Sequence, residues 1–465
     1  MTAGFDGLTF RDLDEAIAHC RPALEKMRDG HIFITGGTGF SGRWLLAVLA
    51  RAHDDYSIRV TALSRDPARF ATTCPDLACH PAIAFVRGDV RYFEFPKGRF
   101  THVIHAATDT SVAADADPTT LIDSIVSGTT RVVEFAESAD IRRLLYISSG
   151  AVYGPQPMEI DHLSEDYRGA PDPLDPRSAY GQAKRLAEQL CACAAGRGRL
   201  QPVIARAFAF VGPGLPLDGH FAIGNFIADA LNEEEIVVSG DGAPLRSYLY
   251  AADLAAWLLT LLVEGESCAA YNVGSDAAIS IADLAARVSG CCSAPPVVTI
   301  KGAPKPDAPR ARYVPSIARA RALGLDVWTQ LERAIARTME FERRRPARVV
   351  APDARNEHTR DERLTFVVDV DGVVASLTPG NDYTLAEPLG ETIAAVNALY
   401  EKGHRIVMLT ARGSATGIDW RKTTEEQFAR WGLRYHELHF GKPAADYYID
   451  DRLMPVSALK AMART

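Results

Sequence analysis

Residues 31–44 read HIFITGGTGFSGRW, and this stretch decides the fold of the first part of the chain. A mostly apolar run of strand type leads straight into a glycine-rich turn, and an apolar helical pattern begins directly after it. Gly36, Gly39 and Gly42 stand in a GxxGxxG spacing between the two. In a βα unit the first glycine permits the tight turn, the second lets the backbone approach a pyrophosphate, and the third lets the helix pack close to the sheet. The segment therefore predicts a dinucleotide site at a helix N-terminus.

Strand-like and helix-like patterns alternate around this segment. A leading helix is expected over residues 8–28, and helices over 119–138 and 178–195 separate later strands. Those strands are expected at IRVTAL, AFVRGDV, THVIHAA, LLYISS and PVIARAF. Such alternation is typical of a parallel sheet with helices on both faces. We expect an α/β fold with a Rossmann-type doubly wound sheet and a small substrate-binding lobe.

A second α/β pattern begins at LTFVVDVDG, after a charged segment over 342–363 that carries two prolines. The pattern continues with helices over 386–402 and 421–431 and with the strands RIVMLTA and DYYIDD. The predicted domains are an N-terminal helical extension (1–29), a first module (30–345), a linker (346–363) and a second domain (364–465).

Composition restricts the partners of the protein. The 465 residues are 47% hydrophobic and carry a formal net charge of -8, so charge gives no case for nucleic acid or an anionic membrane. No apolar run reaches the roughly 18 residues that a membrane span needs. The eight cysteines form no CxxC pair, and reduced thiols in a cytoplasmic protein are the simpler interpretation.

The end of the second predicted strand, VTALSRDPARF, bears on the choice of cofactor. An NAD site usually has a carboxylate there to accept hydrogen bonds from the ribose. Here Ser64 and Arg65 hold those positions, and a cation suits a 2′-phosphate, so the sequence favours NADP over NAD; the alternative is that Arg65 is a solvated surface residue. The residues expected to contact the cofactor are Gly36, Gly39, Phe40, Ser41, Gly42, Ser64, Arg65, Asp89, Val90, Ala106, Ala107, Tyr180 and Lys184.

SAYGQAK places Tyr180 and Lys184 four residues apart, and therefore on one face of the predicted helix. A lysine cation beside a tyrosine favours the phenolate, which can take a proton from a sugar hydroxyl while hydride leaves for nicotinamide. Ser149, at the end of the strand in YISSGAVYG, could hydrogen-bond the same oxygen. A lone YxxxK is usually an exposed helical pair, but the glycine turn and the serine strand precede it here in order.

The motifs TGGTGFSG, GDV, HAA, YISSGAVYG, YGQAK and RSYLYAADLA together resemble the extended short-chain dehydrogenase/reductase family, the NAD-dependent epimerases and dehydratases of nucleotide sugars. The resemblance covers roughly residues 30–345. It implies Ser149, Tyr180 and Lys184 as the catalytic trio, and Asn225 and Arg246 as contacts to the substrate's diphosphate. It also implies a homodimer formed through the helix that carries Tyr180.

Three departures from that family narrow the reaction. The family's 4,6-dehydratases carry an Asp-Glu pair just after the serine, whereas this chain has Gly150 and Ala151. Ala209 replaces an asparagine that contacts the substrate, and Ile125 replaces the asparagine common in the family's NVxGT helix. We therefore expect epimerisation or 4-keto reduction; the alternative is a 4,6-dehydratase whose acid and base come from elsewhere.

In the second domain, polar residues follow the predicted strands. Asp369 and Asp371 end LTFVVDVDG, so that one carboxylate could attack phosphorus while the other protonates the leaving oxygen. Their charges would repel a phosphate unless a divalent cation such as Mg²⁺ were bound. VMLTAR supplies Thr410 at the end of another predicted strand, and GKPAADYYIDD supplies Lys442 and an acidic pair at Asp450 and Asp451. A hydroxyl, a lysine and late carboxylates would bind phosphate and hold the metal.

This order of motifs resembles the haloacid-dehalogenase (HAD) superfamily, in particular its small capsular-polysaccharide phosphatases. The resemblance implies Asp369 as nucleophile, Asp371 as general acid/base, and Thr410 and Lys442 as phosphate ligands. Mg²⁺ would be held by Asp369, the backbone carbonyl of Asp371, and Asp450. The spacing leaves no room for a large cap domain.

The sequence thus predicts a bifunctional enzyme of surface-polysaccharide or related glycan biosynthesis. One module would act on a nucleotide sugar and the other would hydrolyse a phosphomonoester, such as a sugar phosphate. The alternative from a different class is that one module is retained only as a binding or scaffold domain.

Overall fold

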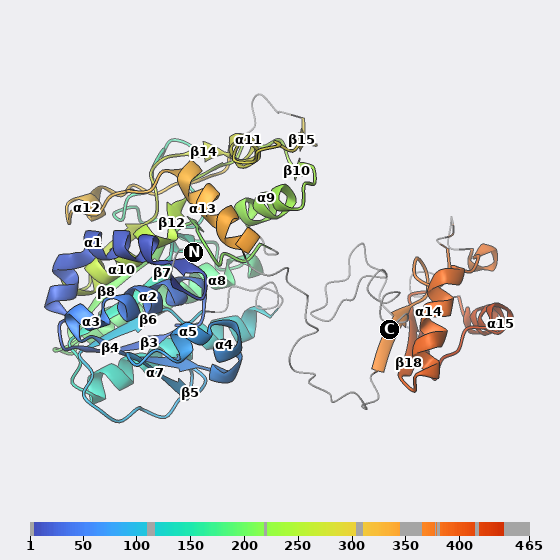
Figure 1. The fold of residues 1–465 in the computed structure, drawn as a ribbon, viewed down its shortest axis with the longest axis horizontal. Coiled ribbons are helices and arrows are strands. Elements are labelled where there is room, and N and C mark those ends of the chain that lie inside the picture. Colours follow the sequence, from blue (N-terminus) through green and yellow to red (C-terminus); the bar gives the residue numbers. More distant parts are fainter. Residues whose placement is uncertain are drawn as a thin grey trace. The chain divides into compact units, whose positions relative to one another are not determined.

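The computed structural model describes residues 4–108, 117–217, 221–303, 310–344, 365–376, 378, 382–413 and 418–440. Contacts divide the chain into two compact units, Met1–Ala351 and Pro352–Thr465 (Figure 1). The predicted linker and the predicted site residues Lys442, Asp450 and Asp451 lie outside the described residues. The predicted domain boundaries therefore stay a prediction.

A seven-stranded parallel sheet forms the centre of the first unit. Its strands are β3 (His31–Thr35), β4 (Arg59–Ser64), β5 (Ile83–Arg87), β6 (His102–His105), β7 (Arg143–Ser149), β8 (Gln201–Ala207) and β13 (Ala270–Val273). They lie in the order β13-β8-β7-β6-β3-β4-β5 and all pair in parallel. The order of the strands along the chain reverses between β3 and β6, which is where doubly wound sheets bind their ligands. The predicted Rossmann-type sheet is confirmed.

Successive residues of β3 point into different cores, which explains why the strand is apolar throughout. Ile32 and Ile34 pack in one cluster with α1 (Phe10–Lys26), α2 (Phe40–Arg51) and α10 (Ala251–Glu264). Phe33 packs in a second cluster with α7 (Pro118–Ser138) and α8 (Ala179–Gly196). Strands buried on both faces read as continuous apolar runs, so the pattern in the sequence follows from the two layers of helices.

The remaining elements of this unit lie outside the seven-stranded sheet. Around the sheet lie β1 (Gly4–Phe5), β2 (Leu8–Thr9), α3 (His53–Tyr56), α4 (Pro67–Thr73), α5 (Pro75–Ala78), η1 (Gly150–Tyr153) and η2 (Pro176–Ser178). The later part of the unit, called the lobe below, contains β9 (Phe210–Val211), α9 (Ala222–Leu231), β10 (Ile236–Val238), β11 (Leu245–Arg246), β12 (Leu249–Tyr250), β14 (Ile279–Ser280), α11 (Ile281–Gly290), β15 (Val298–Ile300), β16 (Arg312–Tyr313), α12 (Ala318–Arg321) and α13 (Leu331–Arg344). A three-stranded sheet in the order β14-β11-β16 holds Arg246 and Tyr313. No described helix is long and apolar enough to cross a membrane.

The leading helix α1 is tied into the first unit by buried charges. The Thr9 side chain caps it by accepting from the backbone N–H of Asp12, 3.2 Å away. Arg337 of α13 contacts the Asp12 carboxylate at 2.6 Å and that of Glu15 at 2.7 Å. The Tyr250 hydroxyl donates to Asp12 at 3.1 Å. The two ends of the first unit are thereby joined through one buried arginine.

The described part of the second unit contains three parallel strands in the order β17-β18-β19. These are β17 (Thr365–Asp369), β18 (Arg405–Thr410) and β19 (Glu437–Phe440), accompanied by η5 (Tyr383–Leu385), α14 (Gly390–Glu401) and α15 (Arg421–Trp431). Val368, Ile406, Met408 and Phe428 form part of its core. The predicted strand DYYIDD lies outside the described residues.

Candidate functional site

Two glycines of the turn after β3 hold positions where a side chain does not fit. A Cβ at Gly36, whose φ is +71°, would lie 2.5 Å from the carbonyl carbon of Ala106, and one at Gly42 would lie 2.2 Å from the carbonyl oxygen of Gly36. Gly39 is exposed and is the N-cap of α2, where no side chain caps the helix. Phe40 and Ser41 form the first turn of α2. The open helix N-terminus is thus available to an anionic group, as the fit of a dinucleotide pyrophosphate requires.

A buried chain of hydrogen bonds fixes the end of β6, next to the glycine turn. His105 lies 2.7 Å from the hydroxyl of Thr35 through Nδ1 and 3.0 Å from that of Thr129 through Nε2. The backbone N–H of Ala107 donates to the Thr35 hydroxyl at 3.2 Å. Burial, with the Lys184 charge nearby, lowers the pKa of His105 to about 3, so the ring is neutral. The small residues Ala106 and Ala107 are therefore held against the glycine turn.

At the end of β4 the side chains of Ser64 and Arg65 differ in exposure. Ser64 is buried, and its hydroxyl accepts from the backbone N–H of Asp66 at 3.2 Å. The Asp66 carboxylate caps α4 by accepting from the N–H of Arg69 at 3.0 Å. Arg65 is exposed. The nearby carboxylate of Asp66 is therefore used by α4, and Arg65 is the charged side chain at the strand end.

Asp89 and Val90 follow β5. Hydrogen bonds from Arg91, the shortest at 2.9 Å, hold the pKa of the Asp89 carboxyl below its usual range, and the charge of Arg65 adds to this effect. Val90 packs against Gly128 of α7, where an added Cβ would lie 2.8 Å from a Val90 methyl carbon. Both residues, which the sequence predicts as cofactor contacts, are thus held in place directly after β5.

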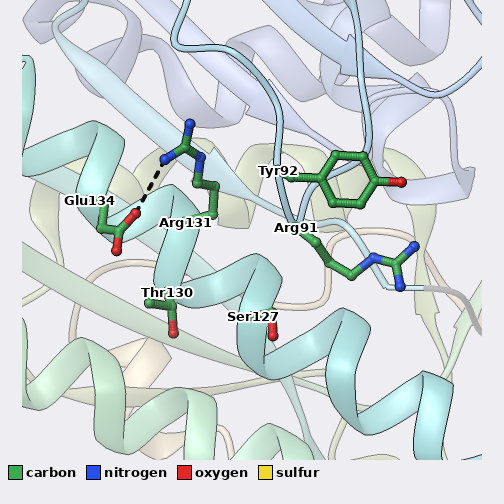
Figure 2. A pocket seen from close by; sticks show the side chains of 6 residues that line it. All are labelled: Arg91, Tyr92, Ser127, Thr130, Arg131 and Glu134. Atoms are coloured by element: carbon green, nitrogen blue, oxygen red, sulfur yellow. Dashed lines mark hydrogen bonds and ion pairs between the residues drawn. The ribbon is translucent and has the colours of Figure 1, made fainter.

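An open surface depression of about 480 Å³ lies next to this region and is a different feature (Figure 2). It is lined by Arg91, Tyr92, Ser127, Thr130, Arg131 and Glu134. Arg91 pairs with Asp89 and with Asp123, and Arg131 pairs with Glu134. Its cations are thus neutralised by neighbouring carboxylates, which argues against an anion site.

Lys184 lies in the protein interior, one helical turn from Tyr180. Its Nζ donates to the hydroxyl of Thr108 at 2.7 Å and to the carbonyl of Ile147 at 2.8 Å. The same atom is 5.9 Å from the centre of the Tyr180 ring and 4.9 Å from that of Tyr146. Burial lowers the pKa of Lys184 to about 7. The cation thus lies between α8 and the end of β7, the strand that carries Ser149.

Tyr313, which sequence reasoning missed, lies beside Ser149. Its hydroxyl hydrogen-bonds to Ser149, and burial raises its pKa well above the ordinary range, with Tyr180 and Arg246 among its charged neighbours. A Cβ at Gly150 would lie 2.6 Å from the Tyr313 hydroxyl and 2.8 Å from Phe208. The position at which the dehydratases carry an acid is therefore filled from β16. No motif marks Tyr313, because β16 is only two residues long.

The predicted diphosphate contacts come from the lobe. Arg246 is half-buried, donates to the carbonyl of Leu245 at 2.8 Å and lies near Tyr313. Asn225 is exposed on the first turn of α9. Tyr313 thus lies near Arg246 and Tyr180 as well as Ser149, whereas Asn225 lies near the N-terminus of α9.

Arg206 has a structural role. It pairs with Glu188 at 2.7 Å and donates to the Tyr153 hydroxyl at 2.9 Å, and the hydroxyl of Ser148 donates to Glu188 at 2.6 Å. This network joins β7, β8 and α8, the elements that carry Ser149, Tyr180 and Lys184. It therefore helps to fix the relative positions of Ser149, Tyr180 and Lys184.

In the second unit, Asp369 and Thr410 end neighbouring strands. Asp369 pairs in register with Leu409, the residue before Thr410, so both side chains belong to the carboxyl edge of the sheet. The Asp369 carboxylate accepts from the N–H of Val370 at 2.8 Å. Thr410 is buried, and its hydroxyl accepts from the N–H of Arg412 at 3.1 Å.

The Asp371 carboxylate has a partner that the sequence did not predict. Arg412 contacts it through Nη2 at 2.7 Å and through Nε at 3.0 Å. Both oxygens of the Asp371 carboxylate thereby contact the guanidinium. Among the described residues there is no group of three His, Cys, Asp or Glu side chains able to hold a metal; the third predicted ligand, Asp450, lies outside them.

Comparisons with known proteins concern the first unit. The pattern of the NAD dependent epimerase/dehydratase family matches residues 32–274. UDP-glucuronic acid decarboxylase 6 of Arabidopsis thaliana is 30% identical over 295 residues, which are 62% of this chain and 82% of that protein. The low-salt glycan biosynthesis protein Agl12 of Haloferax volcanii is 31% identical over 258 residues, 54% of this chain and 78% of that protein.

Solved structures agree with this match. MoeE5 in complex with UDP-glucose and NAD is 25% identical, has a TM-score of 0.56, and aligns over 68% of this chain and 99% of that one. MoeE5 in complex with UDP-glucuronic acid and NAD is 26% identical with the same TM-score and the same shares of both chains. The chain therefore belongs to the NAD dependent epimerase/dehydratase family of nucleotide-sugar enzymes.

Proposed function

We propose that the first unit oxidises a nucleotide sugar at C4 with NAD(P)⁺ and then completes an epimerisation, or that it runs the reverse half-reaction as a 4-keto reductase. The observation that carries this proposal is the position of the Lys184 ammonium, which lies near the Tyr180 ring and donates to the carbonyl of Ile147 near the end of β7. Tyr180 takes the proton of the C4 hydroxyl, and the hydride of the same carbon leaves for nicotinamide. The ammonium of Lys184 stabilises the phenolate, and Ser149 holds the sugar oxygen.

The crowding around Gly150 argues against dehydration. Loss of water from C5 and C6 needs one group to remove a proton and another to protonate the leaving hydroxyl. Gly150 and Ala151 offer neither, and Tyr313, with its raised pKa, is a poor base at neutral pH. A 4-keto intermediate is therefore used for stereochemical inversion or reduction rather than for elimination.

Decarboxylation is a second candidate, because relatives with 29–30% identity are named UDP-glucuronic acid decarboxylases. Oxidation of a uronic acid at C4 produces a β-keto acid. Such an acid loses CO₂ readily, since the neighbouring carbonyl accepts the electron pair of the breaking bond. The same trio would serve this reaction.

One experiment separates these reactions. The protein is incubated with UDP-glucose or with UDP-glucuronic acid, with NAD and with NADP in parallel, and the products are identified by mass spectrometry and NMR. An epimer has the mass of its substrate, a decarboxylated sugar lacks one CO₂, and a dehydrated sugar lacks one water. Loss of water would reject the proposal, and Y180F is the matched inactive control.

For the cofactor, we infer a preference for NADP. Arg65 supports it as the exposed cation at the end of β4, where the neighbouring carboxylate of Asp66 caps α4 and that of Asp89 is paired with Arg91. The named complexes of MoeE5 contain NAD, so the two nucleotides have to be compared directly. Mass spectrometry of nucleotides released from the purified protein tests this inference, and release of NAD alone would contradict it.

For the second unit, we propose a Mg²⁺-dependent phosphomonoesterase of the HAD type. The pairing of Asp369 with Leu409 supports it, because it brings the strand ends that carry Asp369 and Thr410 together at one edge of the sheet. Asp369 would attack phosphorus, Asp371 would protonate the leaving oxygen, and Thr410 and Lys442 would bind the phosphate. Mg²⁺, held by Asp369, the carbonyl of Asp371 and Asp450, would neutralise the phosphate charge.

The test is phosphate release from p-nitrophenyl phosphate and from sugar phosphates, with Mg²⁺ and with EDTA. Wild-type protein is expected to be active only with the metal, and D369N to be inactive. Activity indifferent to D369N, or absent in all conditions, would favour a scaffold role for this unit. Together the two activities would make a bifunctional, cytoplasmic enzyme of polysaccharide or glycan biosynthesis, and a homodimer through α8 is expected on sizing with light scattering.

A further inference from the structure

Arg412 is a buried cation in the second unit. Its side chain is 0% exposed, whereas that of Asp371 is 19% exposed. A guanidinium with no exposed surface does not contact a substrate, but a partly exposed carboxylate can. Any influence of Arg412 on the reaction must therefore act through its neighbours.

The guanidinium is held on every side by described residues. Nε and Nη2 contact the Asp371 carboxylate at 2.7–3.1 Å. Nη1 donates to the Thr424 hydroxyl at 3.1 Å and to the side-chain oxygen of Gln427 at 2.7 Å, both on α15. The Tyr383 ring lies 4.8 Å from the guanidinium carbon, and Gln427 donates to the Tyr383 carbonyl at 2.6 Å. The cation is thus anchored to α15 and η5, and its fork is directed at one carboxylate.

We propose that Arg412 is a positioning residue, which fixes the carboxylate of Asp371 in the orientation needed for proton transfer to the leaving group. This inference rests on the proposed phosphatase function. A planar fork that contacts both carboxylate oxygens fixes the carboxylate plane, which a lysine's single point charge does not. Because Arg412 is itself held by α15, it can keep the Asp371 side chain, which follows β17, in a defined orientation.

The leaving group provides a direct test. p-Nitrophenolate is a stable anion and needs little protonation as it leaves, whereas the alkoxide of a sugar phosphate needs a proton. R412Q and R412K are therefore expected to lower kcat on a sugar phosphate such as glucose 6-phosphate by about tenfold to a hundredfold, part of what general acid catalysis contributes. On p-nitrophenyl phosphate the loss is expected to be below about threefold, with KM nearly constant on both substrates, because the direct role of the acid is small there.

The ratio of the two rates within one preparation is independent of how much protein is folded, so partial unfolding of a variant does not imitate the result. R434Q is the matched control, because Arg434 is an exposed arginine of the same unit that pairs with Glu401. In a D371N background, R412Q is expected to add no further loss. Equal losses of R412Q on both substrates, or additive losses with D371N, would overturn the inference.

Failure of the inference is distinguishable from failure of the proposed function. If wild-type protein releases no phosphate from either substrate, or if D369N is as active as wild type, the phosphatase proposal itself is wrong. If wild type is active, D369N is inactive and R412Q behaves like R434Q, only the role of Arg412 is wrong.

Discussion

The hydroxyl oxygen of Tyr313 leaves no room for a side chain at residue 150, because a Cβ added at Gly150 would lie only 2.6 Å from it. The two residues come from different parts of the fold, one from the turn after β7 and the other from the lobe strand β16. The Tyr313 hydroxyl also hydrogen-bonds to Ser149. The space beside residue 150, where the dehydratases carry an acidic side chain, is thus occupied here by Tyr313.

We predict that G150A damages the first unit. The added carbon must displace the hydroxyl of Tyr313 or the ring of Phe208, and overpacking of this kind costs about 1–3 kcal/mol. Thermal unfolding and kcat on the nucleotide sugar measure the two effects. In a Y313F background the cost is expected to fall, since the Tyr313 hydroxyl, the nearest of the three clashing atoms, is gone.

G196A is the control for this prediction. A Cβ at Gly196, at the end of α8, would meet nothing within 4 Å. This substitution is expected to leave both readouts unchanged or to stabilise slightly. If G150A were as mild as G196A, the close contact with Tyr313 would be wrong.

Arg65 is predicted to distinguish the two dinucleotides. R65A removes the cation proposed to contact the 2′-phosphate, so Kd for NADP should rise about tenfold, the value of one charge-assisted hydrogen bond at an exposed site. Kd for NAD should change little, because NAD has no phosphate there. Fluorescence titration of both nucleotides measures this difference, and R69A, an exposed arginine on the adjacent α4, is the control. Equal weakening of both nucleotides by R65A would contradict the prediction.

Whether a strand and its site residues could be predicted from the sequence depends on the length of the strand. β3 could be predicted because Ile32, Phe33 and Ile34 pack into both cores and so form a continuous apolar run. β11 and β16 are two residues long, which is too short for any periodicity to show. Tyr313 was therefore missed, although Ser149 beside it was predicted.

The same reasoning applies to the second unit. The VMLTAR segment predicts Thr410 at a strand end. The proposed role of Arg412, by contrast, depends on its contact with Asp371, which lies 41 residues earlier in the chain. Nothing in the local pattern of either residue indicates the other. Residues fixed by one element could be predicted from the sequence, whereas those defined by contacts between distant elements could not.

The buried pair of Arg337 and Asp12 is predicted to dominate the attachment of α1. Their side chains are 9% and 4% exposed, so R337A leaves an unpaired carboxylate in the interior, at a cost of about 3–5 kcal/mol. Urea denaturation measures the change. R333A is the control, because Arg333 is 45% exposed in its pair with Glu15 and should cost at most about 1 kcal/mol. Equal effects of the two substitutions would show that the buried pair contributes little.

Lys184 is predicted to make stability depend on pH. Burial lowers its pKa to about 7 from an ordinary value of 10.5, so between these values the unfolded chain binds a proton that the folded chain does not. Stability from this group therefore rises with pH through that window, by at most about 1.4 kcal/mol per pH unit. Below about pH 7 the lysine is charged in both states, and the folded state carries the full cost of burying the charge.

K184M provides the comparison, because methionine fills similar space without a titrating group. The free energy of unfolding, measured in urea without cofactor, should increase from about pH 7 to about pH 10 more for wild type than for K184M. The difference between the two proteins cancels the contributions of other titrating groups, such as surface tyrosines. A difference that stays constant, or that falls as pH rises, would mean that Lys184 remains charged in the folded protein, and its interior placement beside Thr108 and Ile147 would have to be revised.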